Sequence, residues 1–342
     1  MCFSRSGLKS RDHLVLTDNL DLLAVMEDGC VDLVYIDPPF GTGKRREGPE
    51  TENGAAGYDD TINEPEEFVE WLAPRMRELW RVLSDNGSIV IHLDPRAVHH
   101  VRLWCDREFG VDRWENEIVW HYTGGGRSKA RFSRKHDILL WYSKGDGRVF
   151  NIDAIREPYK PTSGYAKGGI VSRKGKKYMP HPEGTPADDV WGIPIVNPMS
   201  GERSAYPTQK PVKLLERVIA ALSSPEAVVC DVFCGSGTTA VVCRTLGRSS
   251  ICCDNNPDAI RATLERLASV GKAHPPAVLS HGLYRLPFAV PERAKSMAAR
   301  FIREGLRLND GVPAEILLPS WIQEESPAQP LRMSDIIIRV EG

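Results

Sequence analysis

The feature that most restricts the fold is an alternation of short apolar runs, glycines and acids late in the chain. Residues 228–233 have the composition of a buried strand, and the turn Cys234-Gly235-Ser236-Gly237-Thr238-Thr239 follows at once. A helical segment then leads to a second strand, 249–253, which ends at Asp254. In α/β nucleotide-binding folds, such glycines let the backbone approach a cofactor, and such an acid binds ribose hydroxyls. The pattern predicts this kind of site, although the Gly-x-Gly spacing lacks the third glycine of a dinucleotide fingerprint.

A second candidate site lies much earlier, at Asp37-Pro38-Pro39-Phe40. The tetrapeptide follows the β-branched apolar run 31–36, which predicts a buried strand. Because proline lacks an N–H and fixes φ, the strand must end there and leave carbonyl groups outside its hydrogen-bond ladder. A carboxylate, a free carbonyl and an aromatic ring can together hold a flat heterocycle that carries an amino group. A simple strand-to-loop turn is the alternative interpretation.

An acidic residue, Asp18, also follows the first predicted strand, 13–16. In open α/β sheets, ligands bind at the carboxyl ends of the strands, so we expect Asp18 and Asp37 to share one crevice. Both Asp18 and Asp254 precede predicted helices, and helix N-capping is the alternative role for each of them.

The charge of the chain is unevenly distributed, although the net value over 342 residues is only −2. Residues 124–181 hold fourteen Lys and Arg against four acids, which predicts a polyanion-binding surface. A solvated basic loop is the alternative. The residues expected to contact a nucleic acid are Arg127, Lys129, Arg131, Arg134, Lys135, Arg173, Lys174, Lys176 and Lys177.

Residues 150–205 show little hydrophobic periodicity and are rich in Pro, Gly, Lys and Arg, with interspersed tyrosines. We therefore predict an insertion outside the sheet, with a composition suited to phosphate contact and base stacking. Periodicity returns at Pro207-Thr208-Gln209-Lys210-Pro211, which introduces an amphipathic helix extending to about residue 222.

These three motifs, in this order, resemble the β-class DNA amino-methyltransferases that use S-adenosyl-L-methionine, in which the catalytic motif precedes the cofactor motif. The resemblance covers residues 13–270. It implies an α/β, Rossmann-like methyltransferase fold with permuted motif order, in which helices cover both faces of a mixed, mostly parallel sheet. The implied divisions are a catalytic half at 13–149, a basic target-recognition insertion at 150–205, a cofactor-binding half at 206–272 and an accessory segment at 273–342.

The resemblance also implies roles for individual residues. The catalytic residues would be Asp37, Pro38, Pro39 and Phe40: the Asp37 carboxylate and the Pro38 carbonyl accept the two amino hydrogens of a flipped base, and Phe40 stacks on it. Asp254 would bind the cofactor ribose and Asp18 its adenine, with Thr208, Lys210 and Thr238 near its methionine end. The full implied cofactor-binding set is Asp18, Thr208, Lys210, Asp231, Phe233, Cys234, Gly235, Ser236, Gly237, Thr238 and Asp254.

The identity of the first motif residue bears on the target base. In the family, an acid at the position of Asp37 suggests adenine N6 methylation, whereas serine is usual for cytosine N4. Phe40 stands where tyrosine is commoner, which preserves stacking and removes a hydroxyl. The alternatives are a cytosine N4 enzyme, methylation of RNA or of a protein glutamine, and a catalytically silent DNA-binding subunit.

Several other classes are not expected. The eight cysteines have no paired CxxC spacing, so neither a zinc site nor a disulfide framework is predicted, and the reaction needs no metal. No apolar run has the length of a membrane helix, and the N-terminus lacks a signal-peptide core, which favours the cytoplasm. The expected partner is double-stranded DNA; the resemblance allows a homodimer, with any restriction nuclease on a separate chain.

Overall fold

The structure is a computed structural model. The residues that it describes are 3–9, 12–40, 46–47, 57–58, 62, 64–123, 127–197, 199–204, 206–270, 314–317 and 336–340.

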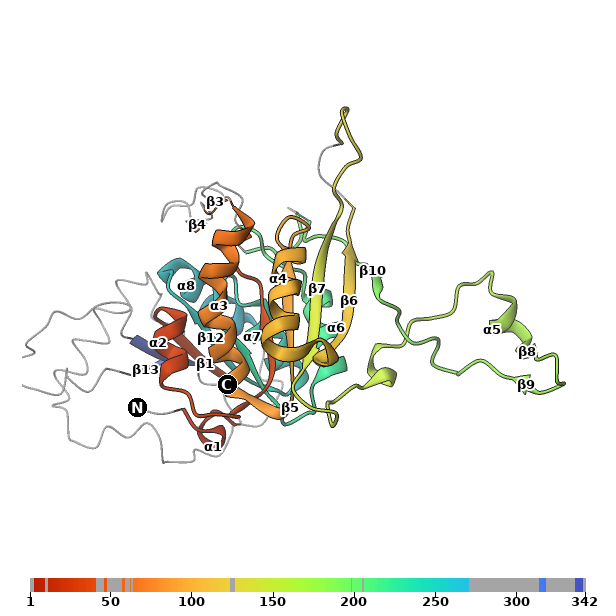
Figure 1. The fold of residues 1–342 in the computed structure, drawn as a ribbon, viewed down its shortest axis with the longest axis horizontal. Helices are drawn as coiled ribbons and strands as arrows, with labels where there is room; N and C mark the ends of the chain where they lie inside the picture. Colours follow the sequence, from red (N-terminus) through yellow and green to blue (C-terminus); the bar gives the residue numbers. More distant parts are fainter. Residues whose placement is uncertain are drawn as a thin grey trace, which may run out of the picture.

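One large mixed sheet runs through the centre of this part of the chain (Figure 1). Its strand order is β10-β6-β7-β5-β2-β11-β12-β1-β14-β13. The strands are β1 (Asp12–Leu16), β2 (Val31–Ile36), β5 (Leu83–Leu93), β6 (Trp114–His121), β7 (His136–Ser143), β10 (Val190–Gly192), β11 (Val228–Asp231), β12 (Ser249–Asp254), β13 (Ala314–Leu317) and β14 (Ile336–Val340). Two short pairs lie outside it: β3 (Arg46–Glu47) with β4 (Gly57–Tyr58), and β8 (Ile170–Val171) with β9 (Lys177–Tyr178).

Helices cover both faces of the sheet. One face packs against α1 (Arg5–Leu8), α2 (Asn19–Ala24), α3 (Pro65–Val82) and α4 (Val98–Cys105), which continues into a π-helical turn (Asp106–Gly110) and a 3₁₀ turn (Val111–Arg113). The other packs against α6 (Val212–Leu222) and α7 (Thr238–Leu246), and α8 (Pro257–Ser269) contacts α7. The short 3₁₀ turn Ile152–Ile155 and α5 (Gly164–Gly168) lie in the insertion.

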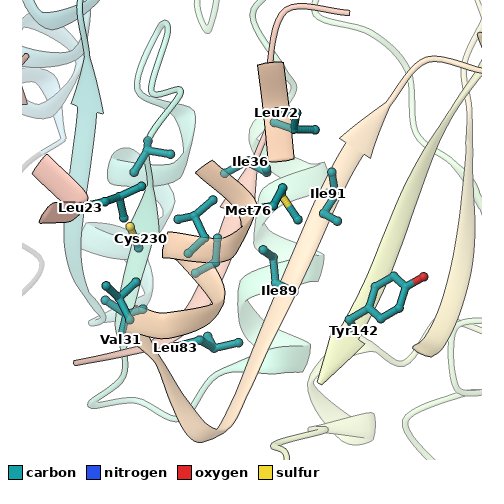
Figure 2. Close-up of a cluster of buried hydrophobic side chains, with 14 of the residues drawn as sticks. Leu23, Val31, Ile36, Leu72, Met76, Leu83, Ile89, Ile91, Tyr142 and Cys230 are labelled. Atoms are coloured by element: carbon teal, nitrogen blue, oxygen red, sulfur yellow. The ribbon is translucent and has the colours of Figure 1, made fainter. Parts of the chain in front are cut away.

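The sequence of the central strand β2 is almost continuously apolar because both of its faces are covered. Val34 and Ile36 belong to the core cluster under α3, whereas Leu33 and Tyr35 belong to the cluster under α6. Figure 2 shows α3 packing its buried stripe, including Leu72, over Ile36 and the neighbouring strand β5. A strand that is covered on both faces must be apolar on both, as is typical of parallel sheets between helix layers. The predicted α/β fold is confirmed.

The strand directions bring the chemically interesting residues to one edge. β1, β12, β11, β2 and β5 are consecutive parallel neighbours, and β7 is antiparallel to both β5 and β6, so β6 runs in the same direction as β2. The carboxyl ends of β1, β2, β11 and β12 therefore meet at one edge, which places Asp18, Asp37, Asp231 and Asp254 there.

The prediction that all of 150–205 lies outside the sheet was wrong for one segment. β10 pairs in parallel with β6 at the sheet edge, and both Trp191 and Ile193 are buried. A run this short, set among prolines and charges, gives no usable periodicity in the sequence. The rest of the insertion extends away from the sheet as an arm that carries α5, β8 and β9 (Figure 1).

The described parts of the 273–342 segment also join the sheet. β14 pairs antiparallel with β1, and β13 pairs with β14. The remainder of that segment lies outside the described residues. Within the described part of the chain, no helix is both long enough and apolar enough to cross a bilayer.

Candidate active site

A cavity of about 620 Å³ opens at the edge of the sheet where the four acids meet. Its volume falls within the range of small-molecule and cofactor sites. With the exception of Gly237, every residue predicted for catalysis or cofactor binding lines it: Asp18, Asp37, Pro38, Pro39, Phe40, Thr208, Lys210, Asp231, Phe233, Cys234, Gly235, Ser236, Thr238 and Asp254. The structure thus brings two motifs that are far apart in the chain to one cavity.

The glycine turn between β11 and α7 forms one wall. Gly235 and Gly237 have φ of 52° and 74°, a region in which other residues are strained. At Gly237 a Cβ atom would also lie 2.4 Å from side-chain atoms of Thr263, so only glycine fits. Gly237 therefore contributes by shaping the turn from behind, without lining the cavity.

Asp254 is attached to this turn by backbone hydrogen bonds. The Gly235 N–H donates to Asp254 Oδ2 at 2.8 Å, and the Asn256 N–H donates to Oδ1 at 2.9 Å. Burial raises the pKa of Asp254 to about 6, against the lowering effect of these N–H donors. The carboxylate both organises the backbone and faces the cavity, where it can still accept hydrogen bonds from hydroxyl groups.

Asp231 uses its oxygens to build the same turn. The Phe233 N–H donates to Oδ1 at 3.0 Å, and the Thr239 hydroxyl donates to Oδ2 at 2.5 Å. Burial raises the pKa of Asp231 to about 7, with further contributions from the charges of Asp37 and Asp254. Asp231 lines the cavity, and these contacts identify it mainly as a support for the turn.

Asp18 caps a helix and also lines the cavity, as the two interpretations of its sequence position had suggested. Its Oδ1 accepts the Leu20 N–H at 2.9 Å, which makes it the N-cap of α2, and it also lines the cavity. Arg75 of α3 approaches Asp18 Oδ2 at 3.9 Å, and its guanidinium lies 4.1 Å from the ring centroid of Trp71. Arg75 and Trp71 were not predicted to line the site, because their spacing also fits an ordinary amphipathic helix.

Asp37 is the most distinctive group in the cavity. Its Oδ2 accepts a hydrogen bond from the ammonium group of Lys210, whose Nζ also lies 5.1 Å from the centroid of the Phe40 ring. Its Oδ1 is buried and has no hydrogen-bond partner among the described residues. Leaving a buried carboxylate oxygen unpartnered is costly, which indicates that a ligand donor completes the site.

Lys210 connects the two halves of the cavity. The resemblance suggested a place near the methionine end of the cofactor, whereas the side chain pairs with Asp37 and the carbonyl accepts the Thr238 hydroxyl at 3.1 Å. The neighbouring Thr208 has φ of 58°, an uncommon value for a non-glycine residue, at the cavity wall. Gln209 supports this segment by accepting the Ser204 N–H and donating to the Glu202 carbonyl, each at 2.7 Å.

A buried polar network that was not predicted lies behind Phe40. The ring of His92, on β5, is 5.9 Å from that of Phe40. The Tyr35 hydroxyl is 2.8 Å from His92 Nδ1, and His92 Nε2 is 3.2 Å from Asp137 Oδ2. The Tyr122 hydroxyl donates to the other Asp137 oxygen at 3.2 Å.

Two pKa shifts show that the groups of this network interact. Burial, with the charge of Asp37 next, raises the pKa of Tyr35 well above its usual value, so its hydroxyl keeps its proton beside His92 Nδ1. Although burial alone would raise the pKa of Asp137, the hydrogen bond and charge of His92, followed by Lys210 and Tyr122, lower it overall. Asp137 is therefore favoured as a carboxylate, with its Oδ2 at 3.2 Å from His92 Nε2. The sequence signal for this network was the position of His92 directly after the apolar run 89–91 of β5.

The predicted nucleic-acid contacts fall on two projections rather than on one surface. Arg127, Lys129, Arg131, Arg134 and Lys135 lie on the loop between β6 and β7, which rises beyond the sheet (Figure 1). The second group, Arg173, Lys174, Lys176 and Lys177, lies at and beside the β8–β9 turn on the arm. All are exposed except Lys135, which is partly buried. No cluster of potential metal ligands occurs among the described residues.

The sheet, its topology and this edge cavity define a Rossmann-like methyltransferase. A solved structure with a similar fold is the PvuII DNA methyltransferase (cytosine-N4-specific), with a TM-score of 0.56 and 18% identity, covering 77% of this chain and 88% of that chain. The DNA methylase family matches residues 31–265, and the chain belongs to this family of N6/N4 methyltransferases.

Curated relatives agree with that assignment. The type II methyltransferase M.HpaI of Haemophilus parainfluenzae is 30% identical over 75% of this chain and 74% of its own length. The DNA adenine methyltransferase YhdJ of Escherichia coli (strain K12) is 31% identical over 69% of this chain and 76% of its own length. The chain is thus a DNA methyltransferase that uses S-adenosyl-L-methionine and acts on an exocyclic amine, either adenine N6 or cytosine N4.

The residues present fit that cofactor. The cavity is large enough for a nucleoside derivative, the glycine turn allows close backbone approach, and Asp254 offers a carboxylate beside it. Trp71 and Asp18 also line the cavity, and their aromatic ring and carboxylate suit a purine that carries an amino group.

Proposed function

We propose that this methyltransferase modifies the N6 amine of an adenine that is flipped out of double-stranded DNA. The observation that carries the proposal is the state of Asp37. One of its oxygens is held by Lys210, and the other is buried in the cavity without a partner among the described residues. That oxygen is ready to accept a hydrogen bond from an incoming amine.

The chemistry of the target explains this arrangement. The lone pair of an exocyclic amine is delocalised into the ring, which makes the nitrogen a weak nucleophile. Asp37 Oδ1 accepts one amino hydrogen and the Pro38 carbonyl accepts the other, which localises the lone pair on nitrogen, while Phe40 stacks on the base. When bound, the cofactor supplies a methyl group that its sulfonium centre already activates. Asp37 Oδ1 is then placed to receive the proton that the methylated nitrogen must lose.

The choice of adenine rests on Asp37 and on one relative. In the family an acid at this position accompanies adenine methylation, and YhdJ, whose name specifies adenine, is among the curated relatives. The PvuII enzyme, which is described as specific for cytosine N4, shares the fold at low identity. Cytosine N4 methylation is accordingly the second candidate, because its amine presents the same two hydrogens.

Nucleoside analysis tests the proposal. The purified protein is incubated with duplex DNA and isotopically labelled S-adenosyl-L-methionine, and the DNA is digested to nucleosides. We expect the label in N6-methyl-2′-deoxyadenosine; label in N4-methyl-2′-deoxycytidine, or label in RNA but not in DNA, would contradict the adenine assignment. Long-read sequencing of DNA from expressing cells then maps the recognition site. A protein that transfers no label and does not bind the cofactor in calorimetric titration would be a silent DNA-binding subunit.

We further propose that both projections hold the DNA backbone. Their exposed Lys and Arg side chains suit phosphate contact, and each contact that forms releases counterions. Replacing Arg173, Lys174, Lys176 and Lys177 by Ala should weaken DNA binding and reduce the slope of log Kd against log salt, without changing cofactor affinity. A quadruple variant with an unchanged salt slope would remove the arm from the DNA interface.

A further inference from the structure

The loop between β6 and β7 stands close to the cavity in the topology of the sheet. β6 ends at His121 on the same edge as the ends of β2 and β11, so the loop rises from the edge at which the cavity opens (Figure 1). The Tyr122 N–H donates to the Lys135 carbonyl at 3.0 Å and closes the base of the loop. Directly below, Tyr122 and Asp137 belong to the network behind Phe40.

One side chain on this loop has no place in any core. Phe132 is 100% exposed, the highest value among the large apolar side chains that the structure describes. It lies between the exposed cations Arg131 and Arg134. Singly exposed apolar residues are common on protein surfaces, but a fully exposed phenyl ring with an arginine on each side of it in the sequence suits a partner that is both apolar and polyanionic.

The loop is organised by its own hydrogen bonds. The Ser133 hydroxyl accepts the Ser128 N–H at 3.0 Å, and the Ser128 hydroxyl accepts the N–H groups of Ala130 and Arg131, each at 3.2 Å. These contacts give residues 128–133 a compact turn, which presents Phe132 outward in a defined way.

We propose that Phe132 enters the base stack of duplex DNA and fills the space left by the flipped base, while Arg131 and Arg134 bind the adjoining phosphates. The inference rests on the proposed function, because only a flipped base leaves such a space. An apolar side chain inserted between base steps replaces the lost stacking and holds the duplex open. Because the loop rises from the edge at which the cavity opens, DNA bound there can receive the Phe132 side chain and place the flipped base in the cavity at the same time.

The test compares two substrates in single-turnover methylation. One is a fully paired duplex that contains the mapped recognition site, and the other carries an abasic site opposite the target adenine, which makes flipping easier. We expect Phe132→Ala to lower the single-turnover rate constant on the paired duplex by about tenfold or more, and on the second duplex by less than about threefold. Phe132→Trp should retain activity on both. Emission from 2-aminopurine at the target position, which reports unstacking, should fall in step with activity on the paired duplex.

A matched control separates this role from the general effect of removing an exposed apolar side chain. Leu103, on α4, is 58% exposed, and Leu103→Ala should leave both substrates unaffected. Equal loss on the two duplexes in Phe132→Ala, or none on either, would overturn the proposal. A change of mass for Phe132→Ala in sedimentation would also overturn it, since Phe132 would then belong to a contact between copies of this chain.

Failure of the proposed function gives a different result. If the wild-type protein methylates cytosine instead, the adenine assignment fails, and the same pair of duplexes built around a target cytosine still tests insertion. If the wild-type protein methylates neither duplex, both the proposed function and the insertion role are overturned together.

Discussion

The two sides of the cavity treat their carboxylates differently. After their roles in the proposed function, the wall formed by the glycine turn, Asp231 and Asp254 is called the cofactor side, and the wall formed by Asp37, Phe40 and Lys210 the base side. On the cofactor side, Asp254 and Asp231 each use both oxygens for protein donors, namely backbone N–H groups and the Thr239 hydroxyl. On the base side, Asp37 is paired through one oxygen only, and the other is buried without a partner among the described residues. The carboxylate oxygens of the cofactor side all have protein partners, whereas in the proposed function the substrate amine supplies the missing partner on the base side. Variants on the base side should therefore reduce catalysis more than cofactor affinity.

The largest effect is expected for Asp37→Asn, which keeps the shape of the side chain and removes its charge. The amide is a weaker acceptor and leaves Lys210 without a counterion. We expect methyl transfer to fall by roughly 10³-fold, with the cofactor Kd changed by less than about threefold. Steady-state methylation and calorimetry measure the two quantities. The exposed Asp28 provides the control, since Asp28→Asn should match the wild type. A large loss of cofactor affinity would break the distinction between the two sides.

Lys210→Met tests to which side Lys210 belongs. If the ammonium acts by holding Asp37, its removal lowers kcat by about 10- to 100-fold and leaves the cofactor Kd nearly unchanged. Lys213, exposed at the start of α6, supplies the matched control Lys213→Met. The opposite pattern, with weakened cofactor binding and unchanged kcat, would return Lys210 to the cofactor side.

The cofactor side should respond to pH. The pKa of Asp254 is raised to about 6 and that of Asp231 to about 7, so both carboxyl groups gain a proton as the pH falls through these values. A protonated Asp254 is a poorer acceptor for hydroxyl groups, and neutral carboxyls attract a cationic cofactor less. The affinity should weaken about tenfold between pH 8 and pH 5, measured by calorimetry. Asp254→Asn should bind weakly at all pH values and show a flatter profile; an unchanged slope would contradict the assignment.

The smallest effect is expected for Tyr35→Phe, which removes one hydroxyl behind the base side. Without this hydroxyl, His92 Nδ1 loses the hydrogen-bond partner that helps to hold the ring beside Phe40. We expect kcat to fall by about three- to fivefold with little change in KM for cofactor. Tyr142→Phe is a matched control, because that hydroxyl donates to Asp106 at 2.6 Å, outside the cavity lining. Equal effects of the two variants, with equal loss of thermal stability, would indicate a purely structural role.

The sequence predicted the cofactor side better than the base side because its signals are local. The glycine turn, its flanking strands and Asp254 lie within a short stretch, and each glycine has a backbone reason to be there. The pairing of Lys210 with Asp37 joins residues that are far apart in the chain, and no local pattern reports it. The network of His92 and Asp137 depends in the same way on the register of β5 with β7.

The basic residues of 124–181 show a different limit of prediction from sequence. Its composition indicated a polyanion-binding surface, but the division of its charges between the β6–β7 loop and the arm depends on where the strands pair. β10 was missed because three residues carry too little periodicity, and its pairing with β6 is what anchors the return of the arm to the sheet. Composition thus indicated a type of partner without giving its geometry.

The position of β1 in the sheet has a consequence for the order of folding during synthesis. β1 is made early, yet its neighbours in the sheet are β12 and β14, which come from much later in the chain. Residues Ser249–Asp254 must leave the ribosome before β1 can form its pairing with β12. The apolar strand β1 therefore stays unpaired while most of the chain is synthesised. Such non-local pairing slows folding and leaves aggregation-prone apolar segments exposed for longer. Chaperone dependence in the cell is the expected cost of placing the catalytic motif ahead of the cofactor motif.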